Sequence, residues 1–266
     1  MSTKWNNAPL FYTVAQVKFN PVLSLKTYIE QIQERLRKHG YPDFRKQPRV
    51  RLNLAQVIGK QPADQPNLML ESTEQYSFDD RERNCGFVLD QSALAFHTTN
   101  YDTFEDFSKV MLSGLEIVND LVRLDYFQRV GIRYLDAVTP RLNESIDQYV
   151  VPQVLGIAGR LGNATLRHSF SETVIEISPE SHVTCRAVIQ SSAIQFPPDM
   201  QGLELKLPDR ITKFDGVHAL IDTDGSFEGR EAFDLYGVKK RLGLLHEEIG
   251  RAFKATYTDH AESVWK

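Results

Sequence analysis

The chain has 266 residues, of which 41% are hydrophobic and 10% aromatic, so it can bury one large core or two smaller ones. Its formal net charge of −4 provides no overall positive field, which disfavours non-specific nucleic-acid binding. The two cysteines, Cys85 and Cys185, lie far apart and outside any CxxC pair, which indicates neither a disulfide framework nor a zinc knuckle. No apolar run approaches the roughly 18 residues of a membrane span, and residues 1–7 lack a signal-peptide core, so we expect a cytoplasmic protein.

The chain opens with a predicted strand and helix. Residues 9–19 alternate as a strand, which Pro21 ends because proline cannot donate to a strand ladder. Ser24 is then the expected N-cap of a helix, with Leu23 packed onto Tyr28 as a hydrophobic staple.

Four short strands and a long helix complete the first half. Alternating segments predict strands at 50–58, 73–78, 85–89 and 92–99, and the last two form a hairpin. Thr103 is the expected N-cap of a helix whose apolar side chains recur at steps of three and four over about five turns. This apolar stripe consists of Phe104, Phe107, Met111, Leu115, Val118 and Val122. Such a helix must cover a sheet or another helix.

The second half follows the same order of elements. Predicted strands occupy 126–138, 165–178, 182–196 and 216–222, and predicted helices occupy 144–158 and 234–258. Pro152 must kink or split the first of these helices.

The two patterns together predict an α+β protein of two similar halves, residues 1–125 and 126–266, in one compact unit. Each half reads strand, helix, about four antiparallel strands, helix, with the helices on one face of a curved sheet. The halves share little sequence identity, so this internal duplication rests on the pattern. The same order occurs, by analogy, in TATA-binding-protein-like saddles. The second face of the sheet is left free for function.

Several segments carry a resemblance to a known family. The run Phe-Gln-Arg-Val-Gly-Ile-Arg-Tyr-Leu-Asp-Ala-Val at 127–138 follows Thr-Thr-Asn-Tyr-Asp-Thr-Phe-Glu-Asp-Phe at 98–107. An opening strand ends in Phe-Asn-Pro at 19–21, and the closing helix carries Leu245-His246, Phe253 and Thr258. In these segments the chain resembles, over nearly its whole length, a sporadically distributed family of uncharacterised bacterial proteins of about this size. The motifs are structural in type and no activity is established for the family, so the resemblance implies a fold and hardly a function.

Two arginines are the main candidates for ligand binding. Arg129 and Arg133 lie four apart on one face of the predicted strand, about 13 Å from each other, and two guanidinium groups can clamp a phosphate or carboxylate. With Tyr134 and His97 they form a candidate site for an acidic or phosphorylated small molecule. Alternatively, both arginines pair with acidic residues on neighbouring strands, as surface arginines usually do.

A basic segment is the candidate for nucleic-acid binding. Its members are Arg35, Arg37, Lys38, His39, Arg45, Lys46, Arg49 and Arg51, interleaved with Tyr41 and Phe44. Single-stranded nucleic acid favours such a mixture of cations and aromatic rings. The alternative interpretation is a solvated helix end and loop, because positive charge also stabilises a helix C-terminus.

Metal and nucleophile motifs are incomplete. His246-Glu247 begins like a zinc-protease signature, but Gly250 stands where the second histidine is required. The run from Asp222 to Gly225 lacks the glycine position and the final glutamate of a calcium loop. The sequence contains no Gly-x-Ser-x-Gly motif, which carries the serine nucleophile in α/β-hydrolases. The sequence therefore predicts no catalytic residue, metal or cofactor.

Three functional hypotheses follow. The leading one is a non-catalytic binding protein whose open sheet face or edge receives a protein partner or a second copy, in a bacterial stress, defence or mobile-element setting. The second is an enzyme or sensor that binds an acidic or phosphorylated small molecule at Arg129 and Arg133. The third, disfavoured by the acidic net charge, is nucleic-acid binding through the sheet saddle or the basic segment.

Overall fold

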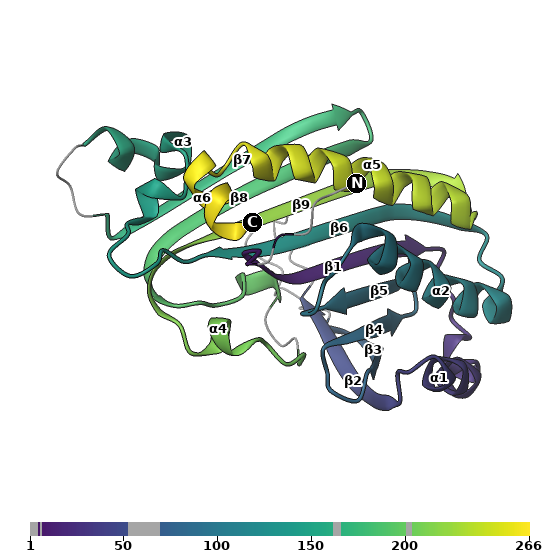
Figure 1. The fold of residues 1–266 in the computed structure, drawn as a ribbon. Coiled ribbons are helices and arrows are strands. Elements are labelled where there is room, and N and C mark those ends of the chain that lie inside the picture. The colour runs from purple at the N-terminus through teal and green to yellow at the C-terminus, as the bar shows by residue number, and fades with distance from the viewer. Residues whose placement is uncertain (1–4, 6, 53–69, 162–165, 201–203) are drawn as a thin grey trace, which may run out of the picture.

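A computed structural model describes residues 5, 7–52, 70–161, 166–200 and 204–266, and these form one open antiparallel sheet with helices (Figure 1). The strand order is β2-β3-β4-β5-β1-β6-β9-β8-β7. The strands are β1 Leu10–Phe19, β2 Asp43–Leu52, β3 Leu70–Asp79, β4 Cys85–Asp90, β5 Ala93–Thr98, β6 Tyr126–Val138, β7 His168–Ser178, β8 Ser181–Ala193 and β9 Asp215–Ala232. The helices are α1 Ile29–Lys38, α2 Phe104–Val122, α3 Pro152–Leu155, α4 Asp209–Thr212, α5 Leu235–Lys254 and α6 Asp259–Trp265. None of these helices is long and apolar enough to span a membrane.

Helices α1, α2 and α5 lie on one face of the sheet, here called the helix face (Figure 1). Their apolar stripes pack on side chains such as Phe78, Phe87 and Val130, which point to this face from the strands. Helix α2 lies especially close to β4 at Gly114, where a Cβ would come within 2.2 Å of the Phe87 ring. Glycine makes this close approach possible. The predicted stripe on α2 is therefore confirmed as part of the cover of the sheet.

The opposite face, here called the open face, is only partly covered. The connection from β8 to β9 crosses it and places Met200, Leu205 and Ile211 against Phe11 and Leu135. This small second core lies at one end of β1 and β6, so part of the open face toward β2 stays uncovered.

Many predicted elements are confirmed. Strand β6 spans 126–138 as the alternation predicted, and β4 and β5 form the predicted hairpin. The Thr103 hydroxyl caps α2 by accepting a hydrogen bond from the backbone N–H of Asp106. All nine strands belong to one sheet, in which β1 pairs with β6, so residues 1–125 and 126–266 share it.

Other predictions were wrong in detail. Ser24 precedes a short 3-10 turn, its side chain makes no capping hydrogen bond, and Leu23 is 80% exposed, so the predicted staple does not form. The predicted strand at 50–58 begins earlier, at Asp43, because its whole length pairs with β3; residues 53–58 lie outside the described part of the chain.

The second half differs most from the prediction. Pro152 splits the expected helix at 144–158 and starts the short α3, as its missing N–H allows at a first helical position. Among the described residues, three strands follow α3, rather than the about four that the repeated order predicts. The predicted strand at 216–222 is longer than expected and forms the 18-residue β9.

Candidate ligand-binding site on the open sheet face

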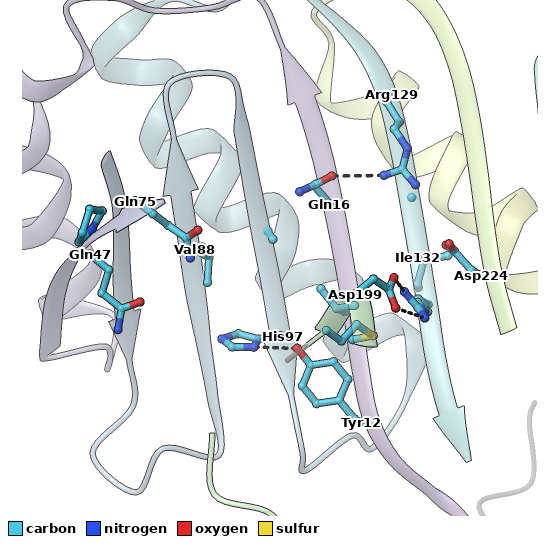
Figure 2. Close-up of a pocket in the computed structure, with 16 residues that line it drawn as sticks. Tyr12, Gln16, Gln47, Gln75, Val88, His97, Arg129, Ile132, Asp199 and Asp224 are labelled. Atoms are coloured by element: carbon cyan, nitrogen blue, oxygen red, sulfur yellow. Dashed lines mark hydrogen bonds and ion pairs between the residues drawn. The ribbon is translucent and has the colours of Figure 1, made fainter. Parts of the chain in front are cut away.

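A cavity of about 550 Å³ lies on the uncovered part of the open face. Its floor is made by small or slender side chains on the central strands, among them Val14, Val88, Ala95 and Gly131. Figure 2 shows polar side chains projecting into it from β1, β2, β3, β5, β6 and β9. Short side chains in the middle of a sheet, ringed by long polar ones, create a hollow.

The strand register sets the spacing of the polar groups. Val14 on β1 pairs with His97 on one side and with Arg133 on the other, and Arg133 pairs with Asp224 on β9. Cross-strand partners point to the same face, so His97 and Arg133 both lie on the open face. Their backbones are two strand spacings apart, which is about 10 Å. The sequence could not predict this spacing because it depends on which strands are neighbours.

Arg133 is fully engaged by two carboxylates. Its Nε and Nη2 each donate to Asp222 at 2.7 Å, and its Nη1 donates to Asp199 at 2.6 Å. Asp222 is buried on β9. Asp199 comes from the connection between β8 and β9 (Figure 2), and its side chain is exposed. The interpretation that Arg133 pairs with a neighbouring strand is therefore confirmed.

Arg129 is less completely satisfied. Its Nη1 donates to the amide oxygen of Gln16 at 3.2 Å (Figure 2). Its Nε lies 3.6 Å from the exposed carboxylate of Glu228. The guanidinium lies over Gly131, where a Cβ would come within 2.8 Å of Nη1. Gly131 thus allows the cation to lie flat along the cavity floor. Neither contact is the short bidentate pairing that a guanidinium favours, so Arg129 retains capacity to bind an anion.

Asp224 supplies a carboxyl group beside these cations. Burial raises its pKa, while Arg129 and Arg133 lower it. No hydrogen bond joins its side chain to another residue in the described part of the chain. A carboxyl group whose pKa is raised retains its proton more readily and can then donate to a ligand.

Tyr12 and His97 at the cavity wall form a row with Asp79 and Arg45 behind them, in which the distance between His97 and Asp79 is too long for a hydrogen bond. The Tyr12 hydroxyl lies 2.9 Å from Nδ1 of His97 (Figure 2). Nε2 of the same imidazole lies 3.9 Å from Asp79, which also pairs with Arg45. Burial raises the pKa of Tyr12, so the hydroxyl keeps its proton and shares a hydrogen bond with His97. This row orients His97 rather than activating a nucleophile.

The structure brings three of the four predicted ligand-binding residues into one cavity wall and separates the fourth. His97, Arg129 and Arg133 line the open-face cavity. Tyr134 lies on the helix face, where its hydroxyl is 2.9 Å from Nδ1 of His246. Its predicted membership in the arginine site is wrong because successive side chains in a strand point to opposite faces.

Sequence reasoning missed several members of the site. Gln16 and Asp224 follow the alternation of their strands, which is a usable signal. Tyr12 lies next to an irregularity in the β1–β6 register, and Asp199 lies in a connection, so alternation predicts neither.

The basic segment is largely neutralised by acidic neighbours. Arg35 pairs with Asp120, Arg37 and Lys38 with Glu34, and Lys46 with Glu74. Tyr41 packs edge-on against the Phe87 ring instead of facing solvent. Arg49 and Arg51 lie in β2, and their side chains are outside the described part of the structure.

The described residues contain no group of three or more His, Cys, Asp or Glu side chains placed to hold a metal ion. Cys85 and Cys185 are both free, and burial raises the pKa of each thiol to about 11, so both thiols stay protonated at neutral pH.

Comparison with known proteins adds no assignment. The chain matches no protein-family model and no curated protein.

Proposed function

We propose that this protein is a non-catalytic binding protein, and that its open-face cavity takes a small polar molecule carrying a carboxylate or phosphate group. The observation that carries the proposal is the contrast between the two arginines. Arg133 is held by Asp222 and Asp199, whereas Arg129 lies in the cavity with only an amide at 3.2 Å and an exposed carboxylate at 3.6 Å. Arg129 is therefore the anchor for the anionic group.

The rest of the cavity favours a ligand with both donors and acceptors. The amide side chains of Gln16, Gln47 and Gln75 line it, and each amide offers both kinds of group. Burial raises the pKa of Asp224, which weakens its competition with the bound anion for Arg129. One cation, several amides and a small floor suit a compact monoanion better than a polyanion, which also disfavours nucleic acid as the ligand.

The experiment is isothermal titration of the full chain with a panel of small carboxylates and phosphomonoesters. At least one member is expected to bind, and Arg129→Met is expected to weaken that binding at least about tenfold, as for loss of a charge-assisted pair. Arg251→Met is the matched control, because Arg251 is exposed on α5 and pairs with Glu248. Equal affinity of the Arg129→Met variant and the wild type would contradict the proposal.

A second candidate function, binding of a second copy of the chain, is favoured by strand β7. This strand forms one edge of the sheet, and its side chains are exposed on both faces. Phe170 is 58% exposed and Val174 62%, and Ile175 and Ile177 are also exposed. A long, apolar edge strand is a template for pairing with another strand.

Self-pairing of β7 in the antiparallel sense is compatible with its sequence. A two-fold axis at Thr173 places Glu172 opposite Val174 and Glu176 opposite Phe170, so the two glutamates do not face one another. Light scattering of the wild type is expected to give a dimer mass, and Val174→Lys a monomer mass. Leu244→Lys, a change at an exposed position of α5, is the control that should leave the mass unchanged. A monomeric wild type at micromolar concentration would contradict this candidate.

We also infer that the sheet arose by the predicted duplication. Strands β1 and β6 pair at its middle, with β5, β4 and β3 following on one side and β9, β8 and β7 on the other. This order supports the inference, although β2 has no counterpart among the described residues. The resemblance to a bacterial family, and the stress, defence or mobile-element setting, stay predictions.

A further inference from the structure

We propose that a second cavity, on the helix face, binds a small organic amine as its ammonium ion, with Asp136 as the counter-ion and Thr223 as a hydrogen-bond acceptor. This cavity has a volume of about 520 Å³ and is separated from the open-face cavity by the sheet. It lies between β6, β9 and helix α5, with α6 at its rim.

Asp136 is the central observation. Its side chain lines this cavity, yet the residue is only 4% exposed. None of the described residues donates a hydrogen bond to its carboxyl group. A buried carboxyl without a partner is costly to ionise, so its presence in a cavity wall indicates that a ligand supplies the missing partner.

Thr223 is the second, independent observation. It is completely buried, lines the same cavity, and its hydroxyl has no hydrogen-bond partner in the described part of the chain. Thr223 pairs with Tyr134 across β6 and β9, so it and Asp136 are diagonal neighbours on one face. An ammonium group has several N–H donors, so it can donate to a carboxylate oxygen of Asp136 and to the hydroxyl oxygen of Thr223 at the same time.

Aromatic rings supply the third feature. The rings of Tyr101, Phe253 and Tyr257 line the cavity. Aromatic faces attract organic cations and also bury the apolar part of an amine. An anionic ligand fits poorly, because it would meet the Asp136 carboxyl, and Arg210, the cation that acts on this carboxyl, does not line the cavity.

The charge state of Asp136 makes the proposal measurable. The pKa of its carboxyl is raised to about 8, because burial raises it strongly while Arg210 lowers it and Asp222 raises it slightly. The other charged or titratable groups that line the cavity, apart from the tyrosines, are Asp102, His246, Lys254, Glu262 and Lys266. Burial lowers the pKa of His246, so this imidazole stays neutral near pH 7. An ammonium ion binds the ionised carboxylate, so binding must release the proton of Asp136.

The test is calorimetric titration of the full chain with phenethylamine, and with 2-phenylethanol as its uncharged analogue. The affinity of the amine is expected to rise about 50-fold between pH 6 and pH 8, as the ionised fraction of Asp136 grows from about 0.01 to about 0.5. At pH 7, titrations in buffers of different ionisation enthalpy should show release of about 0.9 proton per amine bound. The alcohol should bind at least about tenfold more weakly than the amine at pH 8.

Two variants separate this site from a general loss of structure. Asp136→Asn keeps the shape of the protonated carboxyl, so it should fold normally and lose amine binding. Thr223→Val should weaken the amine severalfold, as for loss of one hydrogen bond. Arg129→Met, on the open face, should leave amine binding unchanged, so failure of either site is seen independently of the other. Equal binding of amine and alcohol, retention of binding by Asp136→Asn, or absence of saturable amine binding at pH 8 would each overturn the proposal.

Discussion

The hydroxyl of Tyr134 on β6 lies 2.9 Å from Nδ1 of His246 on α5. The same imidazole stacks on Phe104, with ring centroids 4.2 Å apart, and Tyr101 packs edge-on against Tyr134. These four residues join the start of α2, the central strand and the closing helix. They come from the segments 98–107, 127–138 and 235–254, which therefore meet in one cluster beside the helix-face cavity.

Removal of the Tyr134 hydroxyl should destabilise the protein. Burial raises the pKa of Tyr134 and lowers that of His246, so a protonated hydroxyl and a neutral imidazole share this hydrogen bond. Tyr134→Phe leaves a half-buried nitrogen without its partner, and we expect a loss of about 1–3 kcal/mol in the free energy of unfolding. Urea denaturation measures it. Tyr101→Phe is the matched control, because its hydroxyl makes only a 3.5 Å contact with Tyr134; an equal loss in both variants would contradict the assigned role.

Stability should fall as the pH rises, because of Asp136. The pKa of this carboxyl is about 8 in the folded protein, above its unfolded value of about 3.9, so the folded state binds the extra proton between these pH values. The protonated carboxyl therefore contributes its full stabilisation below about pH 4. This stabilisation is lost as the pH rises toward 8, and the free energy of unfolding falls by about 5 kcal/mol over that range.

Asp136→Asn should remove that pH dependence. The variant is expected to match the wild type near pH 4 and to exceed its stability at pH 9, in denaturant titrations across the range. Asp209→Asn, an exposed position on α4, is the control and should keep the wild-type slope. A slope that persists in Asp136→Asn would assign the pH dependence to another group.

Loss of the Arg133 side chain should lower the stability of the protein more than its affinity for the open-face ligand. Asp222 is buried, so Arg133→Met leaves a carboxylate with only Arg186, at 3.4 Å, beside it. Breaking a buried pair in this way costs about 3–5 kcal/mol. The double variant Arg133→Met with Asp222→Leu should recover most of this loss in urea denaturation, because no buried charge then lacks a partner. A double variant no more stable than the single one would be the contrary result.

Gly86 should not tolerate a side chain. A Cβ at this position would lie 2.0 Å from an oxygen of Asp79 and 2.8 Å from the carbonyl oxygen of Phe78. Asp79 is completely buried and pairs with Arg45, so Gly86→Ala must displace this pair. We expect a loss of at least about 1–3 kcal/mol in thermal or urea unfolding. Gly243→Ala, with open space around it on α5, should be neutral or slightly stabilising.

The elements themselves follow from the sequence because their signals are local. The alternation at 126–138 corresponds to β6, and the stripe that ends at Val122 corresponds to α2, since side-chain period reflects backbone geometry over a few residues. The same alternation places Arg129 and Arg133 on one face. Elements that depend on distant partners were predicted less well, as at β2, whose start is set by pairing with β3.

The two cavities depend on the tertiary structure. Arg133 is saturated because β9 and the connection carrying Asp199 come from residues far along the chain, and Arg129 stays available because Gly131 lets it lie along the floor. Asp136 follows the alternation of β6, yet only the packing of α5 over the sheet turns it into a buried carboxyl. Alternation determines which face a side chain takes, whereas strand order and helix packing decide what it meets there, because those contacts join residues that no local pattern relates.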